Sequence, residues 1–170
     1  MTTHHFLHAF AFAAMIGLVA VAAAPAHARN QSANDSIRFI NPPTLSSAPR
    51  IASKLVEIPP GSRLIYISGL VGNDAKGKVV GPGDMHAQAK QVFENIRLAL
   101  AAAGGTFKDV VKLNFYVTDM SRADEVRSVR AQYINADAPP ASTLVEVSKL
   151  AAPEYMVEIE AVAAIAPSQR

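Results

Sequence analysis

Residues 86–119 read HAQAKQVFENIRLALAAAGGTFKDVVKLNFYVTD and carry two patterns of hydrophobic spacing in succession. In the first half, apolar side chains recur every three or four residues, which places them on one face of an α-helix. These side chains are Ala89, Phe93, Ile96, Leu100 and Ala103. Asp84 can cap the start of such a helix, and Gly104 with Gly105 can end it. The spacing therefore predicts a helix from about residue 84 to residue 103.

The second half of this stretch alternates with a period of two, as a β-strand does. The apolar face carries Val111, Leu113, Phe115 and Val117, and the other face carries Lys112, Asn114 and Tyr116. The preceding helix can cover the apolar face. We therefore expect a domain in which helices pack on one side of a sheet.

Length and composition set bounds on the fold and on the partners. A chain of 170 residues that is 50% hydrophobic can form one domain with a substantial core. Its 16 basic and 14 acidic side chains form no long block of one sign, so no nucleic-acid partner is expected. The absence of cysteine excludes disulfides, thiolate metal sites and thiol nucleophiles.

The first 28 residues have the composition of a secretory signal peptide. Residues 9–24 carry no charge, and Ala26-His27-Ala28 precedes the first arginine, which predicts cleavage after Ala28. No Lys or Arg opens the segment, so an uncleaved membrane anchor is the alternative. Either way we expect export, to the periplasm or outside the cell, with no membrane association after cleavage.

The next segments are polar and then extended. Residues 29–38 are predicted to be a polar tether, followed by one domain at residues 39–167, which begins with an extended arm at residues 40–50. Residues 53–58 and 63–68, SKLVEI and RLIYIS, flank the turn sequence PPGS and predict a β-hairpin. A glycine-rich loop at residues 73–83 includes one short candidate strand, KVV.

The C-terminal part predicts a second helix and two more strands. SRAD at residues 121–124 is a variant of the capping box, and the helix is expected at residues 122–134, packing Val126, Val129 and Tyr133. The strands are expected at residues 142–147 and 156–164. We assign Val145 and Val147 to one face of the first strand, and Val157, Ile159 and Ala161 to one face of the second.

Two helices can cover only one side of this sheet. The side chains expected on the uncovered side or at its edges are Lys112, Asn114, Tyr116, Glu146, Glu158 and Glu160. A solvated antiparallel face explains them without any function. The alternative is a surface that meets other subunits, because Tyr116, Leu144 and Val162 lie among the carboxylates.

The chemistry open to the chain is limited by its histidines. His86 is the only one outside the predicted signal, so neither a histidine metal site nor a Ser-His-Asp triad can form within one subunit. Glu158 and Glu160 lie two residues apart on one strand face, and such a pair can take part in proton transfer. Paired carboxylates on a solvated strand are the ordinary alternative.

Six motifs in order resemble the Rid family, also called YjgF/RidA, the reactive intermediate deaminases. They are ISG at 67–69, QAKQVFENI at 88–96, AAGG at 102–105, DVVKLNFYVTD at 109–119, VEV at 145–147 and VEIEAVA at 157–163. The resemblance covers roughly residues 39–165. It implies a chorismate-mutase-like α+β fold with a mixed sheet and two helices on one face. It also implies a homotrimer with ligand clefts between subunits.

Deaminating members of that family hydrolyse enamines and imines of amino acids to a keto acid and ammonia without a cofactor. Their pattern P-x-R-S-x-V-E-V includes an arginine that clamps the substrate carboxylate. The matching stretch here is PPASTLVEV, in which Ser142 stands at the arginine position and Leu144 at a position often held by cysteine. The family's ligand-side tyrosine has no counterpart in SKLVEI.

Other positions match the family's site. Glu158 corresponds to the acidic residue associated with water activation, and Gly69 to the glycine that lines the cleft. Arg127 falls where many members carry a ligand-facing asparagine, so it is a candidate for the missing cation, with an ordinary exposed arginine as the alternative. Ser142 and Leu144 complete the expected ligand-binding set, which holds no metal.

The resemblance therefore implies a divergent protein that binds a small ligand without a cofactor. We expect a divergent imine or enamine deaminase, or another hydrolase, acting on a substrate that lacks a carboxylate, since loss of the arginine removes a strong anchor. A noncatalytic binding or holdase-like trimer is the alternative. RNA cleavage, attributed to some relatives, comes last because no basic stripe is present.

Overall fold

The computed structural model describes residues 36–45 and 51–166. The predicted signal peptide at residues 1–28 and nearly all of the predicted tether at 29–38 lie outside the described residues. None of the helices in the described part of the chain has the length and apolar composition needed to cross a bilayer.

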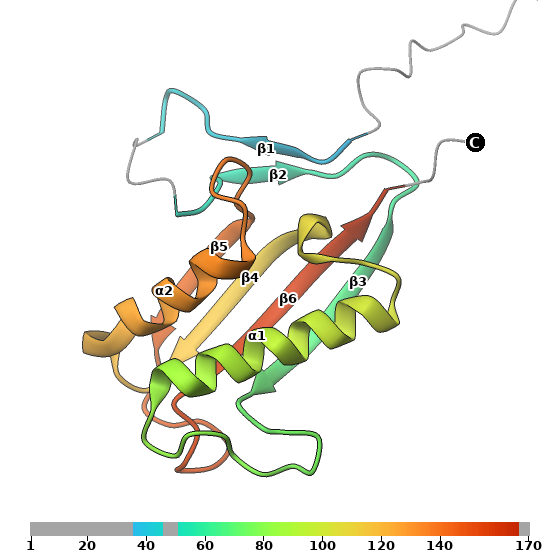
Figure 1. Ribbon diagram of the computed structural model, residues 1–170. Coiled ribbons are helices and arrows are strands. Elements are labelled where there is room, and N and C mark those ends of the chain that lie inside the picture. Colours follow the sequence, from blue (N-terminus) through green and yellow to red (C-terminus); the bar gives the residue numbers. More distant parts are fainter. Residues whose placement is uncertain (1–35, 46–50, 167–170) are drawn as a thin grey trace, which may run out of the picture. The chain divides into compact units, whose positions relative to one another are not determined.

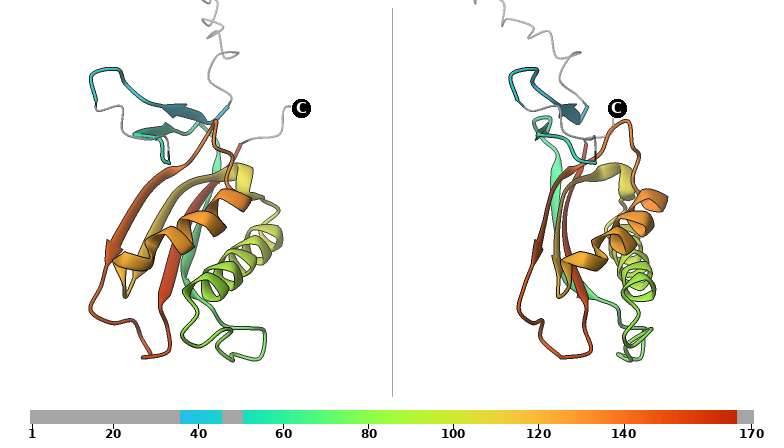
Figure 2. Two further views of the ribbon diagram at one scale, coloured as in Figure 1. Left: turned by 60° about the vertical axis from the view of Figure 1, so that its left-hand side comes forward. Right: turned by 90° about the vertical axis from the view of Figure 1, so that its left-hand side faces the viewer.

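A four-stranded mixed sheet and two helices form the two layers of the fold (Figure 1). The strand order is β3 (Arg63–Val71), β6 (Val157–Ile165), β4 (Val110–Val117) and β5 (Ala141–Glu146), with only β4 and β5 parallel. In the right-hand view of Figure 2 both helices, α1 (Met85–Ala102) and α2 (Ala123–Tyr133), lie on one side of this sheet. The predicted α+β fold, a mixed sheet with two helices on one face, is confirmed.

Helix α1 and strand β4 form as the hydrophobic spacing predicts. Asp84 caps α1 by accepting a hydrogen bond from the Ala87 N–H at 3.0 Å, and Gly104 follows the helix with a left-handed φ of 76°. The buried faces of the two elements meet in one core, which includes Val92, Phe93, Ile96, Leu100, Val110, Leu113, Phe115 and Val117. The helix lies against β3 and β6 of the sheet.

An aromatic cluster extends this core to α2. The rings of Phe93 and Tyr133 stack at a centroid distance of 4.9 Å, and Phe107 contacts both. The Tyr133 hydroxyl donates a hydrogen bond of 2.7 Å to Glu94. Burial and this bond to a carboxylate raise the pKa of Tyr133 to about 12, while the same bond and Arg97 lower the pKa of Glu94.

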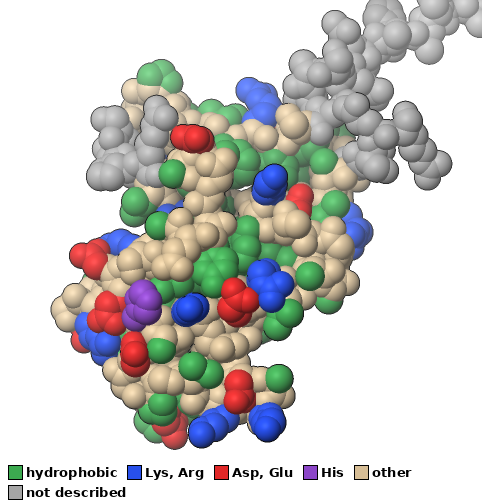
Figure 3. Space-filling view, in the orientation of Figure 1, with side chains coloured by type: hydrophobic (Ala, Val, Ile, Leu, Met, Phe, Trp, Pro, Cys, Tyr) green, Lys and Arg blue, Asp and Glu red, His purple; other side chains and the backbone are tan. Residues whose placement is uncertain are grey.

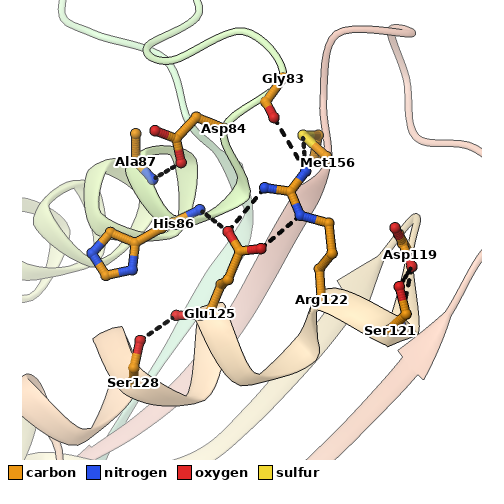
Figure 4. A network of polar contacts seen from close by, with 10 residues as sticks. All are labelled: Gly83, Asp84, His86, Ala87, Asp119, Ser121, Arg122, Glu125, Ser128 and Met156. Atoms are coloured by element: carbon orange, nitrogen blue, oxygen red, sulfur yellow. Dashed lines mark hydrogen bonds and ion pairs between the residues drawn. The ribbon is translucent and has the colours of Figure 1, made fainter.

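A polar network fastens the start of α1 to α2 (Figure 4). Arg122 donates to the Glu125 carboxylate at 2.6 and 2.9 Å and to the Gly83 carbonyl at 3.1 Å. Glu125 also accepts from the His86 backbone N–H at 3.2 Å, and Arg122 lowers the pKa of Glu125. The His86 ring is exposed and points away from these groups, so its only part in the network is through its backbone.

The predicted hairpin of residues 53–68 is wrong. β2 (Leu55–Glu57) pairs instead with β1 (Arg38–Ile40) in a separate two-stranded sheet, and β3 pairs with β6. Alternation shows that a segment is extended but not which strand it pairs with, and β6 offers β3 a long antiparallel ladder. KVV is not a strand either, since Val79 forms only an isolated bridge with Asn73.

The arm formed by residues 36–45 and 51–57, which carries β1 and β2, meets the main sheet beside β5. Ser53 forms an isolated parallel bridge with Ala141, the first residue of β5, and its N–H donates to the Pro140 carbonyl at 3.3 Å. Ser53 is 4% exposed. The arm therefore ends directly beside β5.

The start of the second helix differs from the predicted capping box. Asp119, not Ser121, is the capping residue: it accepts from the Ser121 N–H at 3.0 Å and from the Ser121 hydroxyl at 2.6 Å. A 3-10 turn at Met120–Arg122 follows, and Arg122 at the N-cap of α2 makes no side-chain cap. The Ser121 hydroxyl is used as a donor to Asp119, so it does not cap the helix.

The phase of β5 also differs from the prediction. Leu144 pairs with Phe115 and Glu146 pairs with Val117, so both lie on the helix-covered side. Glu146 accepts a hydrogen bond of 2.7 Å from the Met120 N–H. Val145 is 40% exposed on the side of the sheet that no helix covers, which we call the open face. The expectations for Glu146, Leu144 and Val145 are therefore wrong, because adjacent apolar residues in STLVEV leave the phase of this edge strand undetermined.

Candidate functional site

The open face of the sheet carries polar side chains from β4 and β6. Glu160 accepts hydrogen bonds from the Asn114 amide and the Tyr116 hydroxyl, each at 3.2 Å. Desolvation and the bond to Glu160 raise the pKa of Tyr116. Glu158, two residues earlier on the same face, has no hydrogen-bonding or ion-pair partner among residues 36–45 and 51–166. The two carboxylates therefore differ in their surroundings.

A β-bulge brings Gly69 against Glu158. Ile67 pairs with Ala161 and Leu70 pairs with Ile159, so Ser68 and Gly69 both face the single residue Glu160. A Cβ atom on Gly69 would lie 1.8 Å from Glu158 Oε1. The Glu158 carboxylate thus occupies the space that a side chain at position 69 would fill.

A hollow of about 500 Å³ lies along the outer edge of β3 and is lined by Gly69. Asn95 of α1 is held in its wall, because its amide donates to the carbonyls of Val71 and Asn73 at 3.1 and 2.9 Å. Leu98 adds an apolar side chain that is 56% exposed. The hollow has room for a small molecule beside Gly69.

The other predicted site residues gather at the opposite edge of the sheet. Arg127, Ser142 and Leu144 line a cavity of about 50 Å³ between α2 and β5. Because β3 and β5 are the two edge strands, the structure brings Glu158 together with Gly69 but separates both from these three residues. One chain therefore presents two groups of candidate residues.

Arg127 lies at this cavity with its charge already paired. Its guanidinium contacts Asp124 at 2.7 Å, and 46% of its side chain is exposed. Asp124 lies three residues earlier on the same helix. The geometry agrees with an ordinary exposed arginine on a helix surface.

Arg130 lines the same cavity and was not among the residues expected from sequence. Its Nε and Nη2 atoms are buried and have no hydrogen-bond partner within the described residues. Burial lowers the pKa of Arg130. The sequence does indicate that Arg130 can be partly buried. It stands four residues after Val126 and one residue after Val129, which places it beside the buried face of the helix.

The described residues offer no metal site, and one further hollow lies away from the expected site residues. Residues 36–45 and 51–166 contain no cluster of three His, Asp or Glu side chains placed to bind a metal ion. A mostly apolar hollow of about 610 Å³ lies beside Phe39, Phe107, Tyr133 and Pro140. It includes none of the site residues expected from sequence.

The chain matches a family model and several proteins. The model described as endoribonuclease L-PSP matches residues 46–165. A RutC family protein of Pyrococcus horikoshii is 37% identical over 99 residues, which cover 58% of this chain and 77% of that protein.

Solved structures of similar proteins agree with the fold. A Yersinia pestis protein of unknown function from the conserved Rid family, YyfB, superposes with a TM-score of 0.67 and 36% identity, covering 76% of this chain and 98% of that one. RidA from the Antarctic bacterium Psychrobacter gives a TM-score of 0.57 and 32% identity, covering 68% and 95%.

Proposed function

The chain belongs to the Rid family, and from that premise we propose that it is a cofactor-free hydrolase of small imines or enamines. In the proposed reaction a water molecule adds to the carbon of the C=N bond while Glu158 accepts its proton. Glu158 returns this proton to the nitrogen to give a carbinolamine, and it then carries the hydroxyl proton to the nitrogen as the C–N bond breaks, so that ammonia leaves and the carbon becomes a carbonyl. All atoms of the water and the imine appear in these two products. An enamine first becomes the imine by moving a proton from its nitrogen to its β-carbon.

The observation that supports this role is the free carboxylate of Glu158. A general base needs an acceptor that is not already used by the protein. Glu160 is bound by Asn114 and Tyr116, whereas Glu158 lies over Gly69 without a partner among the described residues. The hollow along β3 gives a substrate access to Gly69.

We also propose that the active form is the homotrimer of the family. The open face exposes apolar side chains of a kind that usually mark an interface: Tyr66 is 76% exposed and Leu64 is 44% exposed. The two groups of candidate residues lie at opposite edges of the sheet, so only contact between the β3 edge of one copy and the β5 edge of another unites them. The molar mass in solution tests this, and a monomer contradicts it.

Export remains part of the proposal. Residues 1–28 have the composition of a signal peptide, so the mature protein is expected to begin at Arg29 in the periplasm or outside the cell. Amino-terminal sequencing of protein from the periplasmic fraction and the medium tests this. A chain that retains residues 1–28 in the membrane fraction supports the anchor instead.

The decisive experiment compares Glu158→Gln with Glu160→Gln in the hydrolysis of 2-aminoacrylate generated in solution. Loss of a general base lowers kcat by roughly 100-fold or more, so Glu158→Gln should lose most of its activity. Glu160→Gln keeps an oxygen that accepts from Asn114 and Tyr116, and it should retain activity within a few-fold. Equal activity of the wild type and Glu158→Gln contradicts the catalytic role.

Two other functions are separated by the same experiment. If the wild-type protein binds small ligands without turnover, the noncatalytic binding module is favoured. RNA cleavage is suggested by the description of the family model. Acidic and basic side chains are interspersed over the face shown in Figure 3, and the net charge is +2, so this surface offers no basic patch for a phosphate backbone.

A further inference from the structure

The buried guanidinium of Arg130 is the polar group that the structure leaves least satisfied. A guanidinium carries five N–H donors and stays charged in proteins. Two of its nitrogen atoms, Nε and Nη2, are buried without a hydrogen bond to any described residue. Buried polar groups normally have partners, and an exception calls for an ion, a water or a ligand that completes it.

The charge of Arg130 is also uncompensated. The ion pairs of the described residues involve Arg38, Arg97, Arg122 and Arg127, each with a carboxylate within 2.9 Å. Arg130 has none of these partners, and burial lowers its pKa. Its neighbour Arg127, three residues earlier, reaches solvent and pairs with Asp124. The contrast shows that burial, and not the helix itself, sets Arg130 apart.

The walls of the cavity select for a small anion. Ile51, Phe115, Val126 and Leu144 supply apolar walls and Ser142 supplies a hydroxyl, and none of the described residues that line the space is a carboxylate. Arginine binds planar carboxylates with two parallel hydrogen bonds, which are strengthened when water is excluded. A single water needs roughly 10–15 Å³ of such space, so a cavity of about 50 Å³ has room for a carboxylate group.

We propose that Arg130 is the anion-binding residue of this protein, and that its guanidinium and the Ser142 hydroxyl hold the carboxylate of the substrate in the cavity between α2 and β5. This assignment rests on the proposed hydrolase function and adds the substrate class, a small imino or enamino acid. It replaces two expectations from sequence: Arg127 as the compensating cation, and a substrate that lacks a carboxylate. The short side chain at position 142 leaves the space into which the ligand's carboxylate fits.

The binding test uses the full chain labelled with ¹⁵N-arginine, with acetate as the probe and acetamide as its uncharged counterpart. One arginine Nε–H resonance should shift saturably with acetate and not with acetamide. Arg130→Gln should remove that resonance and weaken acetate binding about tenfold or more, since it removes a charge-assisted pair. The control Arg97→Gln, at an exposed arginine outside this cavity, should change neither.

Four results overturn the assignment. Three are equal effects of acetate and acetamide, unchanged acetate affinity in Arg130→Gln, and loss of binding in Arg97→Gln. The fourth is dissociation of the oligomer by Arg130→Gln, which would identify a carboxylate of a second copy as the partner. Glutamine favours helices, so the Arg130→Gln chain should fold. Arg130→Lys keeps the positive charge but lacks the paired N–H donors of a guanidinium, so it should bind acetate with intermediate affinity.

Kinetics separate this inference from the proposed function. If Arg130 binds the substrate carboxylate, Arg130→Gln should raise KM for 2-aminoacrylate by about tenfold or more and change kcat less. Acetate binding through Arg130 without any hydrolysis refutes the hydrolase and leaves the anion site intact. Hydrolysis with an unchanged KM in Arg130→Gln refutes the anion site and leaves the hydrolase intact.

Discussion

The Glu158 carboxylate takes the space that a side chain on Gly69 would need. A Cβ atom at position 69 would lie 1.8 Å from Glu158 Oε1 and 2.8 Å from its carboxyl carbon. Both distances are far below van der Waals contact, and the atoms in conflict belong to the free end of a flexible side chain. A larger residue at position 69 therefore moves the carboxylate and leaves the backbone in place.

Gly69→Ala should consequently lower activity more than stability. Gly69 does not have a left-handed φ, so alanine is allowed there, and the free energy of unfolding should change by less than about 1 kcal/mol. A displacement of a catalytic group by about 1 Å can lower kcat by roughly 100-fold. Urea unfolding and the rate of imine hydrolysis measure the two effects. In the control Gly105→Ala, the nearest atom is Ile165 Cδ1 at 3.2 Å, and kcat should stay unchanged.

Arg130→Met should stabilise the protein in a buffer without carboxylates. The change removes a partly buried charge that has no partner within the described residues and keeps the apolar stem, so we expect a gain of about 1 kcal/mol. Arg127→Met, which breaks only a surface ion pair, should stay within about 0.5 kcal/mol of the wild type. Urea unfolding measures both variants. A loss of stability in Arg130→Met would mean that its charge is already compensated.

Ser142→Arg should impair the protein, although it restores the arginine of the family pattern. A second guanidinium in a cavity of about 50 Å³ that Arg130 already lines brings two like charges together and fills the ligand space. We expect kcat/KM for 2-aminoacrylate to fall about tenfold or more. The double variant Ser142→Arg with Arg130→Met should recover much of this loss. Higher activity of the single variant would contradict the assignment of Arg130.

Gln88→Leu should destabilise the fold without affecting the site. Gln88 is fully buried, accepts from the Met156 N–H at 2.9 Å and donates to the Glu154 carbonyl at 2.8 Å. Leucine leaves both backbone groups unsatisfied, at a cost of about 1–3 kcal/mol each. Gln91→Leu removes only a bond to Asn95 and should cost less than about 1 kcal/mol. Thermal and urea unfolding would show whether the two variants differ in this order.

The hydrogen bond between Tyr133 and Glu94 should stabilise the folded protein at intermediate pH, and this stabilisation should be lost at both low and high pH. The pKa of Tyr133 is raised to about 12, so its contribution is complete below pH 10 and is lost as the pH rises toward 12. The pKa of Glu94 is lowered, so its contribution is present above 4.5 and is lost as the pH falls through the depressed value.

Tyr133→Phe isolates this term because it keeps the stacked ring and removes the hydroxyl. The variant should be less stable by about 1 kcal/mol at neutral pH, allowing for solvent screening of the half-exposed pair. Its difference from the wild type should shrink below pH 4.5 and above pH 10. Urea unfolding across this range tests the sign, and a difference that grows at alkaline pH contradicts it.

The sequence predicts α1 and β4 well because both are long and each buries one face. In such elements the residues that are apolar in the sequence pattern are the ones that are buried in the structure, as between Ala89 and Leu100 and between Val111 and Val117. The pairing of β3 could not be read this way, since its partner β6 lies about a hundred residues later in the chain and alternation carries no information on partners. β5 was assigned the wrong phase because Leu144 and Val145 are adjacent apolar residues on an edge strand.

The candidate site residues were predictable from the resemblance and, for Glu158, also from its place beside Glu160 on one strand face. The resemblance singled out Gly69 and Glu158, and the structure brings the two into contact. Their roles remain predictions. The sequence does not single out Arg130, because the family pattern points to position 127 and because a charged residue on a helix is normally solvated. Only the three-dimensional position of β5 shows that Arg130, beside Val126, is turned toward an apolar wall.

The bridge between Ser53 and Ala141 gives the arm an influence on selectivity. Ala141 precedes Ser142, and Ile51, two residues before Ser53, forms part of the cavity wall. The arm lies outside the main sheet, so its side chains can diverge between relatives without disturbing the core. Substrate preference in such a scaffold can therefore evolve by drift in a short peripheral segment, while Glu158 and the architecture around it are inherited intact.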